Sequence, residues 1–164
     1  MPNWCENELT IKGTESEIAR FLNAVKSENS RFDFNAINPQ PETFRAGEDW
    51  HEWRGKNWAT HPIDDRDLKI SQGSVSPDTG QFQIELCFDT AWVPPIPVIL
   101  EASKRFPTLE FDLEYFEADG HFFEGVYRVK DGITLAERHG LFDFDPDSPS
   151  GWTPRETTSV NGQP

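Results

Sequence analysis

The feature that most limits the fold is a strict two-residue alternation between residues 81 and 90. The apolar positions are Phe82, Ile84, Leu86 and Phe88, and the positions between them hold Gln83, Glu85, Cys87 and Asp89. Successive side chains of a strand point to opposite faces, so the pattern predicts a strand with one buried face and one open face. Sheets that are covered on one side only are typical of antiparallel arrangements, which favours an α+β protein.

Other segments of the chain give the remaining strands. Residues 67–76 precede the alternating segment, and Pro77-Asp78-Thr79-Gly80 between them is turn chemistry, so the two segments predict a hairpin. Residues 8–13 and 109–115 alternate in the same way, and residues 121–129 come after a tight-turn signal. The sequence therefore predicts five strands.

Two helices are expected between these strands. Thr14 and Glu17 have the spacing of a capping box, and apolar residues occupy positions 18, 21, 22 and 25. Pro94 and Pro95 suit the first turn of a second helix, which Pro107 ends. Residues 32–35 are interpreted as a short extended piece after the first helix.

The order of elements predicts a ferredoxin-like fold, the split β-α-β plan with two helices on one face of an antiparallel sheet and an extra C-terminal strand. Residues 38–66 are an insertion that contains three tryptophans, two histidines and three prolines. We expect it to be irregular apart from a short helix over residues 48–55. The prediction is one domain over residues 1–140 and a mostly disordered acidic and proline-rich tail over residues 141–164.

The charge of the chain restricts its partners. Its 164 residues include 15 Lys and Arg against 29 Asp and Glu, a formal net charge of −14. Such a charge repels nucleic acids and anionic membranes, which argues against conventional nucleic-acid binding. No stretch is apolar enough to span a membrane, and Cys5 and Cys87 lack the spacing of a redox or metal motif. We expect free thiols and a cytoplasmic protein.

A set of short motifs carries a family resemblance. In order they are Asn3-Trp4-Cys5-Glu6-Asn7, Asn57-Trp58-Ala59-Thr60, Phe88-Asp89-Thr90-Ala91-Trp92-Val93-Pro94-Pro95, Phe106-Pro107, Tyr115-x-Glu117 and Gly120-x-Phe122-x-x-Gly125. Over residues 2–126 the chain resembles the Api92-like, YubB-type family. The resemblance implies a ferredoxin-like domain, an origin in phages, prophages or plasmids, a bacterial host cell, and no established activity. His61-Pro62 departs from the family pattern after Thr60.

These motifs supply the candidate binding residues, which are Asn3, Trp4, Asn57, Trp58, Thr60, His61, Thr90, Trp92, Tyr115 and Glu117. Two interpretations stay open. The tryptophans and their polar neighbours could seal one end of the sheet as a structural cluster, because buried indoles and amides need hydrogen-bond partners. They could also form the floor of a pocket or a hot spot for a partner.

A second candidate is an acidic face on the fourth strand, formed by Glu110, Asp112 and Glu114. Asp143, Asp145 and Asp147 repeat at every second position of the tail, and regularly spaced carboxylates can imitate the phosphates of DNA. The first hypothesis is therefore a non-enzymatic module that binds a basic host or phage protein, as DNA mimics and anti-defence proteins do.

The alternative is a small enzyme or ligand-binding domain with a pocket between the insertion and the sheet, using Trp58, His61, Trp92 and Glu117. No catalytic motif supports it, so a role other than catalysis is favoured. His51 and His61 are ten residues apart, which matches no zinc spacing, and neither a metal nor a cofactor is predicted. An exposed edge strand would allow a homo-oligomer.

Overall fold

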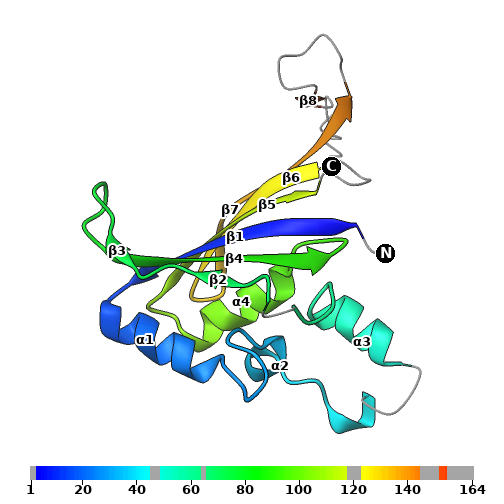
Figure 1. The fold of residues 1–164 in the computed structure, drawn as a ribbon, viewed down its shortest axis with the longest axis horizontal. Coiled ribbons are helices and arrows are strands. Elements are labelled where there is room, and N and C mark those ends of the chain that lie inside the picture. The colour runs from blue at the N-terminus through cyan, green and yellow to red at the C-terminus, as the bar shows by residue number, and fades with distance from the viewer. Residues whose placement is uncertain (1–2, 45–48, 64–65, 118–122, 145–151, 155–164) are drawn as a thin grey trace, which may run out of the picture.

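The architecture is an antiparallel sheet with a layer of helices on one face, seen in a computed structural model that describes residues 3–44, 49–63, 66–117, 123–144 and 152–154. Figure 1 shows the sheet curving over the helices, with its other face open. The sheet order is β2-β4-β1-β5-β6-β7-β8, with β3 also paired to β4.

Four strand positions and two helices make up the predicted ferredoxin-like core. β1 (Trp4–Gly13) lies between β4 (Phe82–Ala91) and β5 (Glu110–Glu117), and it is antiparallel to both. α1 (Glu15–Ala24) comes directly after β1, and α4 (Ile96–Arg105) connects β4 to β5. The outer position beside β4 is divided between β2 (Lys69–Ile70) and β3 (Ser74–Val75). The α+β, ferredoxin-like prediction is confirmed.

The core lies between the sheet and the helices because the predicted alternation is obeyed. Along β4 the side chains of Ile84, Leu86 and Phe88 are buried, and the intervening residues face the other side. Ile18, Phe21 and Val25 bury the stripe of α1, and the Thr14 hydroxyl accepts the Glu17 N–H at the helix start. Satisfying that amide stabilises the first turn, so the capping prediction is confirmed.

The C-terminal half of the sheet is larger than predicted. β6 (Phe123–Lys130) pairs with β5 as expected, and β7 (Ile133–Phe144) then pairs with β6. A turn through Asp131 and Gly132, both with positive φ, joins β6 to β7. β7 runs past residue 140, where the tail was expected to begin, and β8 (Trp152–Pro154) pairs with its end. Residues 141–144 therefore belong to the sheet.

The segment between residues 32 and 57 is more helical than predicted. α2 (Phe34–Ile37) replaces the extended piece expected at residues 32–35, which was wrong, because the Asp33 carboxylate caps the Asn35 N–H and starts a helical turn. A 3₁₀ turn, η1 (Glu42–Phe44), and α3 (Trp50–Asn57) come next along the chain. α3 confirms the expected short helix, displaced by two residues.

No helix in the described part of the chain is long and apolar enough to cross a membrane. Cys5 and Cys87 are both free, as predicted.

Candidate functional site

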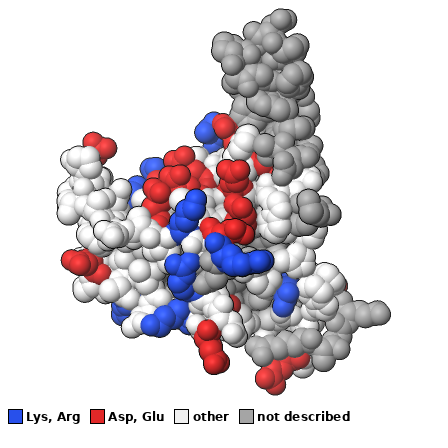
Figure 2. All heavy atoms as spheres, viewed as in Figure 1, with Lys and Arg blue, Asp and Glu red and all other residues white. Residues whose placement is uncertain are grey.

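The open face of the sheet carries a hollow of about 620 Å³ that runs across the central strands. Strand alternation places its side chains: Glu6 and Glu8 of β1 are exposed between buried Cys5, Asn7 and Leu9. The lining includes six carboxylates and three basic side chains, namely Glu6, Glu8, Asp67, Asp89, Glu114, Glu124, Arg66, Lys69 and Arg138. Figure 2 shows acidic side chains gathered on one face of the molecule and bordered by Lys and Arg.

The carboxylates of this face fall into two groups. Asp112 accepts hydrogen bonds from Lys12 Nζ at 3.2 Å and from Arg128 Nη2 at 2.7 Å, and Glu110 lies 3.8 Å from each of these two side chains. The predicted acidic face of Glu110, Asp112 and Glu114 does point outward, but cations from the neighbouring strands neutralise its first two members. We therefore expect Glu110 and Asp112 to contribute little to a basic partner.

The second group has no such neutralisation. In the part of the chain that the structure describes, Glu6, Glu8, Asp89 and Glu114 form no ion pair with Lys or Arg. Register places Glu8 opposite Glu114 and Glu6 opposite Asp89. Like charges directly opposite on neighbouring strands are destabilising, so this arrangement costs stability in the free protein.

The pKa values of two of these carboxylates, Glu8 and Asp89, are raised. Burial raises the pKa of Glu8, and the nearby Glu85 and Glu114 carboxylates raise it further. Burial also raises the pKa of Asp89, with Glu6 and Asp67 adding to the effect and Lys69 opposing it. A bound cation would relieve the repulsion, because an opposite charge favours the ionised carboxylate.

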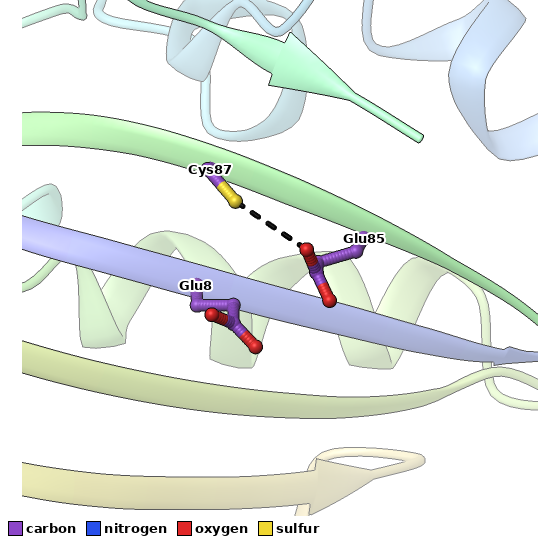
Figure 3. Close-up of side chains that lie close together, drawn as sticks. All are labelled: Glu8, Glu85 and Cys87. Carbon is purple, nitrogen blue, oxygen red and sulfur yellow. Dashed lines mark hydrogen bonds between the residues drawn. The ribbon is translucent and has the colours of Figure 1, made fainter. Parts of the chain in front are cut away.

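Three side chains in this region have ligand atoms close enough together to hold a metal ion. The carboxylates of Glu8 and Glu85 and the thiol of Cys87 lie within 4.8 Å of one another, and the thiol donates to Glu85 Oε1 at 3.6 Å. Figure 3 shows the three pointing toward one another from β1 and β4. Glu8 and Glu85 are exposed, and burial and the two carboxylates raise the pKa of the Cys87 thiol. Such exposed acidic groups commonly hold no ion.

A buried polar network ties the sequence motifs together at one end of the sheet. Asn7 Nδ2 donates to the Cys5 carbonyl at 2.8 Å and to Thr90 Oγ1 at 2.9 Å. Thr90 Oγ1 in turn donates to the Val93 carbonyl at 2.9 Å. Thr60 Oγ1 donates to the Ala91 carbonyl at 2.8 Å. The motif around Thr60 is therefore bonded to the motif around Trp92.

The tryptophans of the motifs have two different environments. Trp58 is 1% exposed, packs on Phe34 and Trp53, and donates its indole N–H to the Asn38 carbonyl at 2.9 Å. Trp4 and Trp92 are each 44% exposed. The structural interpretation therefore fits Trp58, and the partner hot-spot interpretation fits the other two.

Histidine rings extend the exposed aromatic region around Trp92. The His61 ring centroid lies 5.1 Å from that of Trp92 and 5.7 Å from that of Trp50, and Trp50 stacks on His51 at 3.3 Å. Burial lowers the pKa of His61, and Arg54 and His51 lower it further. His61 is therefore neutral at pH 7 and offers ring surface rather than charge.

Three further candidates make contacts inside the fold. Tyr115 packs against Phe123 and His139, and burial raises its pKa to about 12. Glu117 is fully buried and pairs in register with Cys5. Asn57 is half-buried, and its amide donates to the Trp53 carbonyl at 2.8 Å. These interactions are internal to the fold.

The pocket predicted between the insertion and the sheet is not formed by its candidate residues. Trp58 and Glu117 are packed in the interior, and His61 and Trp92 lie together at the surface. The acidic hollow lies on the opposite side of the sheet from the helices. Of the tail carboxylates, Asp145 and Asp147 lie outside the described residues.

The sequence-based prediction missed most of the hollow. Glu6, Glu8, Asp89 and the 39% exposed ring of Phe116 are not among the predicted site residues. A signal was present, since Glu6 and Glu8 alternate with Cys5, Asn7 and Leu9 in the sequence. Whether these side chains form a hollow depends on the strands that flank β1. Alternation within a single strand does not reveal those neighbours.

Comparison with known proteins agrees with the fold. Residues 74–149 match the family model described as the ferredoxin-like domain in Api92-like protein. This match includes the Thr90-Ala91-Trp92 motif and begins after the Asn3 and Asn57 motifs. No curated protein matches the chain.

A solved structure extends the likeness to most of the chain. The crystal structure of a protein Api92 from Yersinia pseudotuberculosis aligns with a TM-score of 0.60 and 11% sequence identity, covering 89% of this chain and 100% of that one. At this identity the likeness concerns the fold. The family model and the shared fold agree that the chain has a ferredoxin-like domain similar to that of Api92-like proteins.

Proposed function

We propose that this protein is a non-enzymatic binding module that takes a basic segment of a partner protein on the open face of its sheet. The observation that carries the proposal is a group of carboxylates around a hollow of about 620 Å³. Within the described ranges these carboxylates, Glu6, Glu8, Asp89 and Glu114, have no ion pair with a Lys or Arg of their own. A basic segment would supply the missing positive charge.

Opposite charges on the two partners would raise the association rate and also stabilise the complex. A negative surface steers a basic partner toward the hollow, which raises the association rate at low salt. Burial and the repulsion between carboxylates raise the pKa of Glu8 and Asp89, and bound Lys or Arg side chains would relieve the repulsion. The hollow is open along the sheet, which suits an extended segment better than an enclosed small molecule.

The setting of this activity is part of the proposal. The Api92-like resemblance favours a phage or plasmid protein in the cytoplasm of a bacterial host, and a basic host or phage protein is the corresponding partner. DNA mimicry would be one form of such binding, in which the carboxylates occupy a groove that otherwise takes nucleic acid.

The test uses two labelled ten-residue peptides of alternating Lys and Ser or alternating Glu and Ser, titrated by fluorescence anisotropy. The basic peptide should bind, its affinity should fall as salt rises, and the acidic peptide should not bind. Replacing Glu8 and Glu114 together by Gln should weaken binding at least about fivefold, since each exposed pair contributes up to about 1 kcal/mol.

The matched control removes the same amount of charge from the helix layer. Glu15 and Glu28 are exposed there, and the Glu15→Gln, Glu28→Gln variant should keep the affinity within about twofold. Equal loss in both double variants would mean that only net charge matters, and the open face would not be the binding site.

A further inference from the structure

Two large aromatic rings are exposed at one end of the open face. Trp4 is 44% exposed and Phe116 is 39% exposed. Cys5, which follows Trp4 on β1, and Tyr115, which precedes Phe116 on β5, both belong to the hydrophobic core. Successive side chains of a strand point to opposite faces, so both rings lie on the side of the sheet away from the helices, which Figure 1 shows on its other side.

Register places the two rings next to each other and next to the carboxylates. Phe116 pairs with Glu6, and Glu6 is two residues from Trp4 on β1, so the two rings are diagonal neighbours on adjacent strands. Diagonal neighbours are roughly 7–8 Å apart, which is within reach of aromatic side chains. Phe116 also lines the hollow of about 620 Å³. The exposed rings are therefore continuous with the proposed binding surface.

The hollow has an acidic side and an apolar side. The acidic side is lined from β1 and β4 by the carboxylates of Glu6, Glu8 and Asp89. The other side, from β5 and β6, includes the apolar side chains of Phe116 and Val126. Glu124 also lies on β6, but Arg138 neutralises it at 3.5 Å. A segment that fills the hollow therefore meets carboxylates along one flank and apolar surface along the other.

A bound segment gains affinity by covering the rings. Aromatic residues are enriched at protein interfaces, and a large apolar side chain taken out of water strengthens an association about tenfold or more. Exposed ion pairs contribute little and are screened by salt, so charge alone does not hold a segment in one position. An apolar contact beside the carboxylates supplies that fixed position.

The spacing of these residues matches the spacing of an extended segment. Glu114 and Phe116 are two residues apart on β5, and Glu6 and Glu8 follow Trp4 by two and four residues on β1. Side chains of an extended chain that point the same way are also two residues apart, roughly 6.6 Å. A segment with basic side chains over the carboxylates therefore places a residue two or four positions further along over the rings.

We infer that Trp4 and Phe116 form an apolar anchor site, and that the basic segment bound by the open face carries a large aliphatic or aromatic residue two or four positions from its basic residues. The inference rests on the proposed function and adds a requirement on the sequence of the partner. The carboxylates attract the segment, and the two rings fix its position along the sheet.

The test compares three labelled ten-residue peptides of equal charge, each with Lys at positions 1, 3, 7 and 9 and Ser elsewhere. The first has Leu at position 5, the second keeps Ser there, and the third has Leu at position 6 instead. In fluorescence anisotropy at one ionic strength, the first peptide should bind at least about fivefold more tightly than the second. The third should bind like the second, because its leucine points to the other side of the extended segment.

The informative variant is Trp4→Ser combined with Phe116→Ser, which should bind the three peptides equally and with the affinity of the second. Its matched control is Val75→Ser combined with Ile133→Ser, because these two apolar side chains are each 63% exposed and neither lines the hollow. The control variant should keep the preference for the first peptide. Circular dichroism checks that both variants are folded.

The outcomes separate the anchor site from the acidic surface. Equal binding of the first two peptides by the unaltered protein, or a preference that survives in the Trp4 and Phe116 variant, would overturn the anchor site while leaving the acidic surface intact. Equal loss of the preference in the control variant would also overturn it. Absence of binding by all three peptides would overturn the proposed function as well.

Discussion

Asn7 offers a quantitative test of how the two central strands are joined beneath the site. Its side chain is 4% exposed, and its amide donates to the Cys5 carbonyl at 2.8 Å and to the Thr90 hydroxyl at 2.9 Å. It also donates to the Phe88 carbonyl at 3.2 Å, so two N–H groups are shared among three acceptors, and substitution by Ala leaves these acceptors short of a partner. At about 1 kcal/mol for each bond, with a further contribution from desolvated groups, we expect a loss of about 2–3 kcal/mol.

The free energy of unfolding is measured by urea titration at pH 7, and the melting temperature by a thermal scan, with circular dichroism as the signal in both. For a chain of this size about 1 kcal/mol corresponds to roughly 2–4 °C, so the melting temperature should fall by roughly 4–12 °C. Asn23→Ala is the control, because Asn23 is exposed on α1, and its change should stay within about 0.5 kcal/mol. A loss below about 0.5 kcal/mol for Asn7→Ala would refute the view that this network holds β1 to β4.

Three further predictions concern single groups. Burial raises the pKa of the Cys5 thiol to about 12, so a thiol reagent should modify Cys87 in the native protein and Cys5 only after unfolding, as mass spectrometry can show. Gly125→Ala should lower the free energy of unfolding by about 2 kcal/mol or more, because an added Cβ would overlap the Tyr115 ring and a backbone carbonyl of β7. The pKa of Glu8 is raised in the folded state, so its ionisation destabilises the fold as pH rises above the ordinary carboxyl range. Glu8→Gln should therefore be more stable than the unaltered protein at pH 7, and the difference should vanish near pH 3 in paired thermal melts.

The ferredoxin-like core could be predicted because its signals are local. The alternation of Ile84, Leu86 and Phe88 and the helical stripe of Ile18, Phe21 and Val25 each result from one element's own period. The short helix α2 was missed because its start depends on a cap from Asp33, and four residues are too few to show a helical period. β7 was missed because most of its described residues are exposed, including Ile133 and Leu135, so pairing with β6 rather than burial defines it.

The candidate site could be predicted only in part. The motifs around Asn3, Thr60, Thr90 and Trp92 do converge, as their mutual hydrogen bonds show. Sequence could not divide them into buried and exposed members, because Trp58 and Trp92 occupy similar motifs and differ in their tertiary surroundings.

The acidic face shows the same limit for charge. Within one strand Glu110, Asp112 and Glu114 are equivalent, and no Lys or Arg separates them. Their neutralisation comes from Lys12 and Arg128, which lie on the flanking strands and reach only the first two. Register across strands, rather than composition along one strand, decides which carboxylates are left for a partner.

The most direct test of binding on the open face is an amide chemical-shift map of the protein titrated with the basic Lys-Ser peptide at low salt. We expect the largest changes along the open face, at Glu6, Glu8, Asp89 and Glu114, with little change in α1 and α4. Changes confined to the helix layer, or no changes at saturating peptide, would contradict the proposed binding surface.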